Sequence, residues 1–76
     1  MKELVEYIAK AVVSHPEEVV VTEEVDDHRH VIRLDVAEDD MGKVIGRGGR
    51  VAESIRSLLK VAAAKSEVRV VLDIGD

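Results

Sequence analysis

The sequence has no cysteine, no phenylalanine and no tryptophan, and its single aromatic residue is Tyr7. The absence of cysteine excludes a disulfide framework, a cysteine nucleophile and thiolate metal sites. No apolar run approaches the roughly 20 residues of a membrane span. The N-terminal segment MKELVEYIAK is interrupted by acidic residues, which is not typical of a signal peptide. We therefore expect a cytoplasmic protein that neither spans nor binds a membrane.

What remains is an aliphatic chain of 76 residues, 46% of them apolar, which predicts one small folded domain over residues 1–76. The net charge is −5, but its distribution is uneven. Residues 1–42 carry four basic and twelve acidic side chains, a net charge of −8. Residues 43–69 carry seven basic and two acidic side chains, a net charge of +5. This asymmetry indicates a local anion site within an acidic protein.

Apolar residues at helical spacing predict two long helices. In residues 2–13, Leu4, Val5, Ala11 and Val12 fall near Ile8 on one face, and His15-Pro16 ends the pattern. In residues 50–65, the apolar stripe consists of Val51, Ala52, Ile55, Leu58, Leu59, Ala62 and Ala63.

Three segments have the composition or alternation of strands: residues 18–25, 30–37 and 68–74. The polar residues 26–29 predict a hairpin between the first two, with Ile32, Leu34 and Val36 sharing one face of the second strand. In the last strand, Val68, Val70, Leu72 and Ile74 should face the core. Residues 38–45 predict one short helical turn that Asp39 or Asp40 could cap. The expected fold is α+β, with a mixed three-stranded sheet and helices on one face.

The stretch Gly46-Arg47-Gly48-Gly49-Arg50 stands directly before the second long helix. The first four N–H groups of a helix have no intrahelical partner and lie at the positive end of its dipole. Glycine lets another backbone approach closely, and arginine donors suit phosphate oxygens. No capping side chain occupies position 49, so these N–H groups are left for a ligand. The pattern predicts a phosphate-binding loop.

Two nucleotide-binding motifs do not fit this loop. A P-loop requires Gly-Lys followed by Ser or Thr after a strand, whereas Lys65-Ser66 lies at the far end of the predicted helix. The dinucleotide fingerprint would require glycine at position 51, which is Val51. The chain is also too short for a doubly wound sheet.

A Gly-x-x-Gly loop between two helices on a three-stranded sheet resembles a KH domain. The order helix–strand–strand–helix–helix–strand resembles the type II, bacterial variant. The stretch Val44–Arg50, followed by Ala52, Ile55 and Arg56, resembles the small bacterial KH-only proteins of the KhpA (YlqC-like) family over nearly the whole chain.

The resemblance implies that single-stranded RNA lies with its backbone on Gly46–Gly49 and its bases in an adjacent aliphatic groove. The absence of Phe and Trp is compatible with such a groove and counts against surfaces that bind RNA by aromatic stacking. The residues expected to bind RNA are Lys43, Val44, Ile45, Gly46, Arg47, Gly48, Gly49, Arg50, Val51, Ile55 and Arg56. The resemblance further implies a homodimer, or a heterodimer with a larger Jag-type KH protein. It also implies a role as an RNA chaperone or post-transcriptional regulator linked to cell-envelope growth and cell shape.

Other interpretations remain open at this point. The acidic first half favours a protein-interaction or assembly module whose loop binds no RNA. Glu53 could oppose a phosphate, or could pair with Arg50 or Arg56. His28 and His30 with the preceding acids are expected to form a hairpin surface rather than a metal site, because no third ligand is evident. The serines lack a base-plus-orienter arrangement, so no catalytic residue, cofactor or small-molecule substrate is expected.

Overall fold

The computed structural model describes residues 1–75. The elements follow the order α1 (Lys2–Val12), β1 (Val20–Asp26), β2 (Arg29–Asp35), α2 (Met41–Ile45), α3 (Arg50–Lys65) and β3 (Arg69–Ile74). Short 3₁₀ turns precede β1 (Pro16–Glu18), α2 (Glu38–Asp40) and α3 (Arg47–Gly49). This order confirms the predicted α+β fold with αββααβ topology. Within the described range, no helix is both long enough and apolar enough to cross a bilayer.

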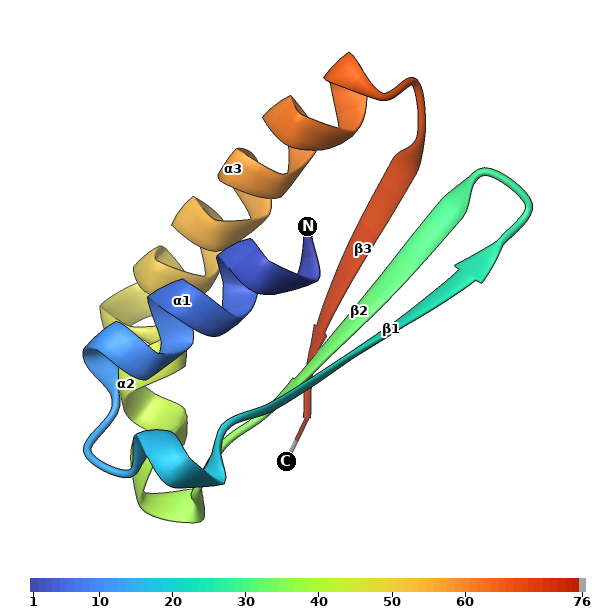
Figure 1. Cartoon of the computed structure of the whole chain (residues 1–76). Coiled ribbons are helices and arrows are strands. Elements are labelled where there is room, and N and C mark those ends of the chain that lie inside the picture. Colours follow the sequence, from blue (N-terminus) through green and yellow to red (C-terminus); the bar gives the residue numbers. More distant parts are fainter. Residues whose placement is uncertain (76) are drawn as a thin grey trace.

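The sheet has the order β1-β2-β3 and is mixed, as the sequence predicts. β1 pairs antiparallel with β2, and β2 pairs parallel with β3. The helices lie on one face of this sheet, and the β1–β2 hairpin lies at the end away from α2 (Figure 1). The parallel pairing requires α2 and α3 to form the crossover between β2 and β3, which carries the glycine loop to one end of the molecule.

The core lies between the sheet and the helices, and its centre is the middle strand β2. Ile32 and Leu34 of β2 have no exposed surface. The core also includes side chains from each other helix and strand: Val5, Ala9, Val21, Val44, Ile55, Leu59 and Leu72. Full burial of each large aliphatic side chain contributes about 1.5–3 kcal/mol, so a chain of this size depends on every one of them.

Several sequence-based boundaries were wrong by one or two residues. α1 ends at Val12 rather than at residue 13, and β1 begins at Val20 rather than at residue 18. Pro16 starts a 3₁₀ turn, and this turn includes Glu18, which was expected to be the first residue of the strand. β2 covers residues 29–35 rather than 30–37, and β3 begins at residue 69 rather than 68.

Parts of the predicted helical stripes are exposed. Ala11 is exposed and Val12 is 39% exposed, because the last turn of α1 lies away from the sheet (Figure 1). Leu58 is 48% exposed. It lies about 100° around α3 from the buried Leu59, which turns it away from the sheet.

A tight turn reverses the chain between α3 and β3. Glu67 adopts a left-handed conformation with φ of 57°, and the Val68 N–H donates to Ala63 O at 3.1 Å. These features define a helix-ending motif that usually places glycine where Glu67 stands. The turn brings β3, one of the two edge strands of the sheet, back along α3.

Candidate functional site

Three glycines give the loop between α2 and α3 its shape. Gly46, Gly48 and Gly49 have φ angles of 79°, 64° and 77°, in the region that side chains disfavour. The Gly49 N–H donates to Gly46 O at 3.1 Å and closes the turn. The sequence pattern therefore marked residues that need glycine for conformational reasons.

Gly46 has a second requirement, which is space. A Cβ atom at Gly46 would lie 2.5 Å from Val51 Cγ2 and 2.8 Å from Val51 N. The same substitution at Gly48 or Gly49 would meet no atom within 4 Å. Gly46 thus allows the end of α2 to pass close to the first turn of α3, whereas Gly48 and Gly49 supply only the left-handed turn.

The N-terminus of α3 has no side-chain cap, and its N-cap residue is Gly49. The Arg50 N–H donates to Arg47 O within the preceding 3₁₀ turn, and no side chain caps the N–H groups that follow. Arg47 and Arg50 are exposed, and within residues 1–75 neither forms an ion pair. Two unpaired guanidinium groups beside uncapped N–H groups make a chemically suitable anion site.

Glu53 belongs to the first helical turns of α3 but does not pair with Arg50. Its Oε1 lies 3.7 Å from Nη1 of Arg56. The Arg56 guanidinium also lies 3.5 Å from the carbonyl oxygen of Leu72 on β3. From the sequence, Glu53 could either oppose a phosphate or pair with Arg50 or Arg56. In the structure Glu53 pairs with Arg56, and the guanidinium group of Arg56 reaches the backbone of β3.

Asp40 does not cap α2, and α2 has no side-chain cap. Instead Asp40 is 1% exposed, and its carboxylate accepts hydrogen bonds from the backbone N–H groups of Ser14 (3.0 Å) and His15 (2.9 Å). The Lys43 ammonium lies 3.5 Å from Asp40 Oδ1. These contacts fasten the turn after α1 to the helix that leads into the loop.

The hydrogen bond from the Ser14 N–H holds the pKa of Asp40 below its ordinary value of 3.8, although burial acts in the opposite direction. The His15 N–H and the positive charge of Lys43 lower the pKa further. The carboxylate is therefore ionised at neutral pH. It forms a buried, negatively charged link, here called the Asp40 anchor, between the turn after α1 and the start of α2.

The expected base groove needs a correction. Val44 and Ile55 are 0% and 1% exposed, so they support the loop from the core and offer no surface to a base. Ile45 is 38% exposed and Val51 is partly buried. A shallow cavity instead lies between α3 and the free edge of β3, lined by Arg56, Leu59, Lys60, Val70, Val71 and Leu72.

This α3–β3 groove continues towards the end of α3, where Ala63, Ala64 and Val68 line a second hollow that shares Lys60, Val70 and Val71 with the first. The sequence analysis did not assign β3 to the site. The alternation of apolar and polar residues predicted which side chains of β3 face the core. It did not predict the order of the strands, and it is the strand order that places β3 at an edge of the sheet.

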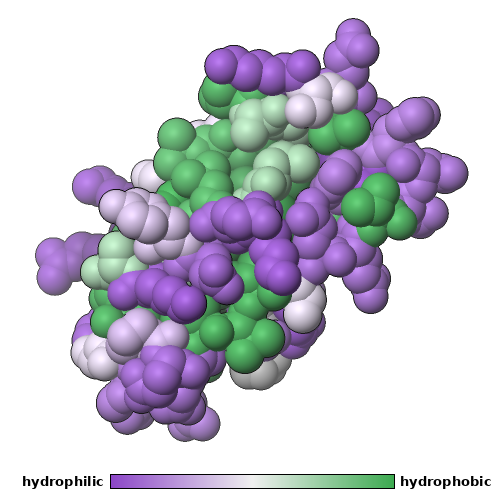
Figure 2. Space-filling view, viewed as in Figure 1, coloured by the Kyte–Doolittle hydropathy of each residue, from purple (hydrophilic) through white to green (hydrophobic). Residues whose placement is uncertain are grey.

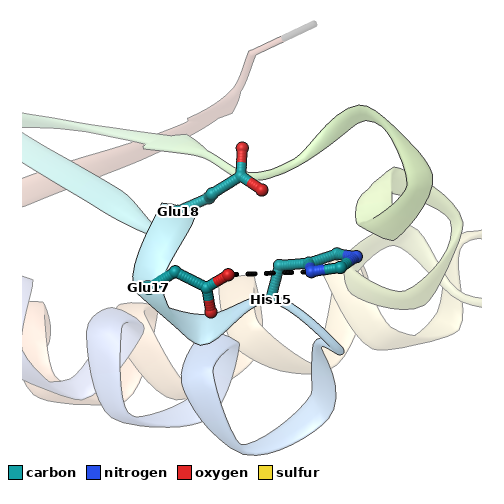
Figure 3. A group of neighbouring side chains, drawn as sticks. All are labelled: His15, Glu17 and Glu18. Atoms are coloured by element: carbon teal, nitrogen blue, oxygen red, sulfur yellow. Dashed lines mark ion pairs between the residues drawn. The ribbon is translucent and has the colours of Figure 1, made fainter.

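The hairpin histidines do not form a metal site together. His30 Nδ1 lies 2.7 Å from Glu23 Oε2, and both side chains are about four-fifths buried, whereas His28 is exposed. A different group of possible ligands, His15, Glu17 and Glu18, lies at the turn before β1 (Figure 3). His15 Nδ1 is 3.7 Å from Glu17 Oε2, and both glutamates are exposed. Such exposed acidic groups are common on protein surfaces, and we assign them no ligand.

The three-stranded sheet and the Gly-x-x-Gly loop between α2 and α3 define a KH domain of type II order. The model of the KhpA/KhpB KH-domain family matches residues 2–74, and the chain belongs to this family. It is a family of KH domains and not a known family of enzymes.

Curated relatives cover the chain from end to end. The chain is 54% identical over 76 residues to the RNA-binding protein KhpA of Halalkalibacterium halodurans, with 100% of both chains covered. It is 49% identical to the RNA-binding protein KhpA of Clostridium perfringens, with 97% of this chain and 99% of the relative covered. It is 44% identical to that of Treponema pallidum, with 99% and 94% covered. The comparison with solved structures found no match.

The two glycines of α2 and its loop form a matched pair for mutation. We expect Gly46→Ala to destabilise the fold by about 3 kcal/mol, because the new Cβ overlaps Val51 and φ is positive. Gly42→Ala adds a Cβ in open space within α2 and should stabilise it by up to about 1 kcal/mol. Urea unfolding measures both changes, and equal effects at the two positions would contradict the close approach at Gly46.

The Asp40 anchor predicts an acid-dependent part of the stability. A carboxyl group whose pKa is lower in the folded than in the unfolded chain stabilises the fold fully above its unfolded pKa. That contribution is lost as the pH falls from about 3.8 through the lowered folded pKa. Urea unfolding of the wild type and of Asp40→Asn between pH 7 and pH 2 should give a stability difference that is constant near neutrality and shrinks below about pH 4. A difference independent of pH would exclude a charged anchor.

Proposed function

We propose that this protein binds single-stranded RNA, with the sugar-phosphate backbone on Gly46–Gly49 and the bases over the α3–β3 groove. The observation that carries this proposal is the N-terminus of α3, which no side chain caps, beside Arg47 and Arg50, which have no ion-pair partner within residues 1–75. Membership of the KhpA/KhpB family and full-length relatives named RNA-binding protein support the same ligand. An RNA ligand implies a cytoplasmic site of action.

The residues expected to bind RNA differ in their exposure and therefore in what they can offer a ligand. Arg47 and Arg50 present charge, Gly46–Gly49 present backbone, and Ile45 and Val51 present aliphatic surface beside the loop. Val44 and Ile55 hold the loop from the core, and Arg56 stands at the near end of the α3–β3 groove. The groove starts about 9 Å along α3 from Arg50, which leaves room for bases beyond a clamped backbone.

The charge pattern predicts modest and weakly specific binding. The net charge of the chain is −5, Lys43 pairs with Asp40 and Arg56 with Glu53, so Arg47 and Arg50 are the cations beside the loop that have no ion-pair partner within residues 1–75. Because each neutralised phosphate on a single strand contributes about −0.7 to the slope of log K against log salt, two available arginines predict a slope near −1.4. Weak and broad binding suits an RNA chaperone or a post-transcriptional regulator.

We expect Arg47→Asp/Gly48→Asp to abolish RNA binding while the domain stays folded. Both positions are exposed and Gly48 has open space around it, and the left-handed φ of Gly48 costs an aspartate only about 1–2 kcal/mol. The matched control is Lys65→Asp/Ser66→Asp, which makes the same change in charge about 24 Å away along α3, beyond two Debye lengths at 0.1 M salt. Fluorescence anisotropy with a pool of short single-stranded RNAs measures binding, and circular dichroism confirms folding.

The RNA proposal fails if the wild type shows no salt-dependent binding to that pool. It fails equally if the loop variant and the control lose the same affinity, because net charge alone would then explain the loss.

The second partner we propose is another KH chain, either a second copy or a larger Jag-type protein. Figure 2 shows hydrophobic side chains gathered on the helical face over α3, bordered by hydrophilic residues. Leu58 and Val61 of α3 are 48% and 60% exposed and lie three residues apart on one face. A domain this small gains stability when such surface is buried in a dimer.

Val61→Lys tests this interface, with Lys60→Met as a control on the neighbouring face of α3. We expect a mass measurement at micromolar concentration to give a dimer for the wild type and the control. The Val61→Lys variant should be a monomer, because a lysine ammonium would be buried without a partner. A monomeric wild type, or a Val61→Lys variant that remains a dimer, would contradict the proposed interface.

A further inference from the structure

Asp40 is the one charged side chain that is buried among residues 1–75. It lies at the start of α2, 25 or 26 residues along the chain from the two N–H groups that it accepts, those of His15 and Ser14. The turn after α1 and the start of α2 are therefore joined through this single carboxylate. Its burial means that the joint is poorly screened by salt.

Lys43 occupies the next turn of the same short helix. Its ammonium lies 3.5 Å from Asp40 Oδ1 and also contacts Ser14 Oγ, while its side chain remains 47% exposed. Lys43 therefore bridges both sides of the joint. Its situation differs from that of Arg47 and Arg50, whose guanidinium groups have no ion-pair partner within the described range.

α2 has five residues, too few for a helix to be stable by itself. Its orientation must come from contacts, and besides the close approach of Gly46 to Val51 two of them hold its start and its middle. Val44 is fully buried in the core on one side, and Asp40 is bonded to the turn after α1 at the N-terminal end. α2 ends at Gly46, so the same contacts determine where the loop begins.

We propose that Asp40 is the positioning residue of the RNA-binding loop, and that it holds Lys43 as its own counterion so that Lys43 neutralises no phosphate. This inference rests on the RNA-binding function proposed above. It assigns Lys43, which the sequence pattern placed among the phosphate contacts, to the support of the loop.

Lys43 could pair with either of two anions, the Asp40 carboxylate or an RNA phosphate, and the pair with Asp40 is the more favourable. Moving Lys43 to a phosphate would replace a pair with a buried carboxylate by an exposed pair that water and salt screen. It would also leave the buried charge of Asp40 with only its two N–H donors, and an uncompensated buried charge is costly. Lys43 therefore stays on Asp40 while Arg47 and Arg50, which have no such partner, meet the RNA.

Four variants test this assignment through the salt dependence of binding to the pool of short RNAs. Arg47→Met should reduce the slope by about 0.7, the loss of one phosphate contact, whereas Lys43→Met should leave it within error of the wild type. Asp40→Asn should release Lys43 and steepen the slope by up to about 0.7. Lys43→Met added to Asp40→Asn should remove that increase.

A Lys43→Met slope that falls as far as that of Arg47→Met overturns the proposal. So does a steepening in Asp40→Asn that persists in the double variant, because the effect would then not pass through Lys43. If Asp40→Asn does not fold, the comparison of Lys43→Met with Arg47→Met decides alone, since both side chains are partly or fully exposed. A wild type without salt-dependent binding refutes the RNA function itself, whereas wild-type binding with a reduced Lys43→Met slope refutes only the positioning role.

Discussion

The close approach of α2 and α3 at Gly46 is the constraint on which the site depends. With only a hydrogen atom at this position, the chain leaves α2 and enters α3 within four residues, and Val51 packs directly over the turn. The approach also lets Val44 of α2 and Ile55 of α3 enter the same core. The loop is therefore not a flexible linker but a turn with one side against a helix and the other side open to solvent.

Local ion pairs determine which cations remain available around this loop. Not every basic side chain of residues 43–69 is available to a ligand, because Lys43 forms an ion pair with Asp40 and Arg56 forms one with Glu53. Both acids stand three residues before the base that they pair with, on the same helix or at its start. Arg47 and Arg50, which have no ion-pair partner within residues 1–75, flank the glycines, so an acidic protein presents a small positive site without a positive net charge.

The sequence predicted the elements and the loop because their signals are local. Apolar spacing marked α3 and the alternating strand β2, and the glycines at 46, 48 and 49 marked a left-handed turn that the structure contains. Features that depend on distant contacts were not predictable in this way. The Asp40 bonds to Ser14 and His15 join residues 25 and 26 positions apart, and no local pattern distinguishes Asp40 from Asp39.

The same limit explains why two of the residues expected in the base groove are buried. Val44 and Ile55 stand beside the loop in sequence, but their burial depends on how α2 and α3 pack together. Val71 lines the groove because β3 lies at an edge of the sheet, and β3 lies there because it pairs only with β2. Proximity along the chain thus predicts the glycine loop as a phosphate site, whereas the α3–β3 groove could be located only from the tertiary structure.

Helix α3 shows how a chain of this length accommodates several surfaces. Its sheet-facing stripe holds the core through Ala52, Ile55, Leu59 and Ala63. Arg56 and Lys60, one turn apart, border the α3–β3 groove, and Leu58 and Val61 face solvent on the other side. Because successive residues are separated by 100°, each of these faces uses positions three or four apart. The core stripe and the groove share Leu59 and Ala63, whereas Arg56 and Lys60 belong to the groove alone and Leu58 and Val61 to the solvent face alone. A change that alters one face can therefore leave the others intact, and this separation is what allows RNA binding, folding and association to be tested independently on a single helix.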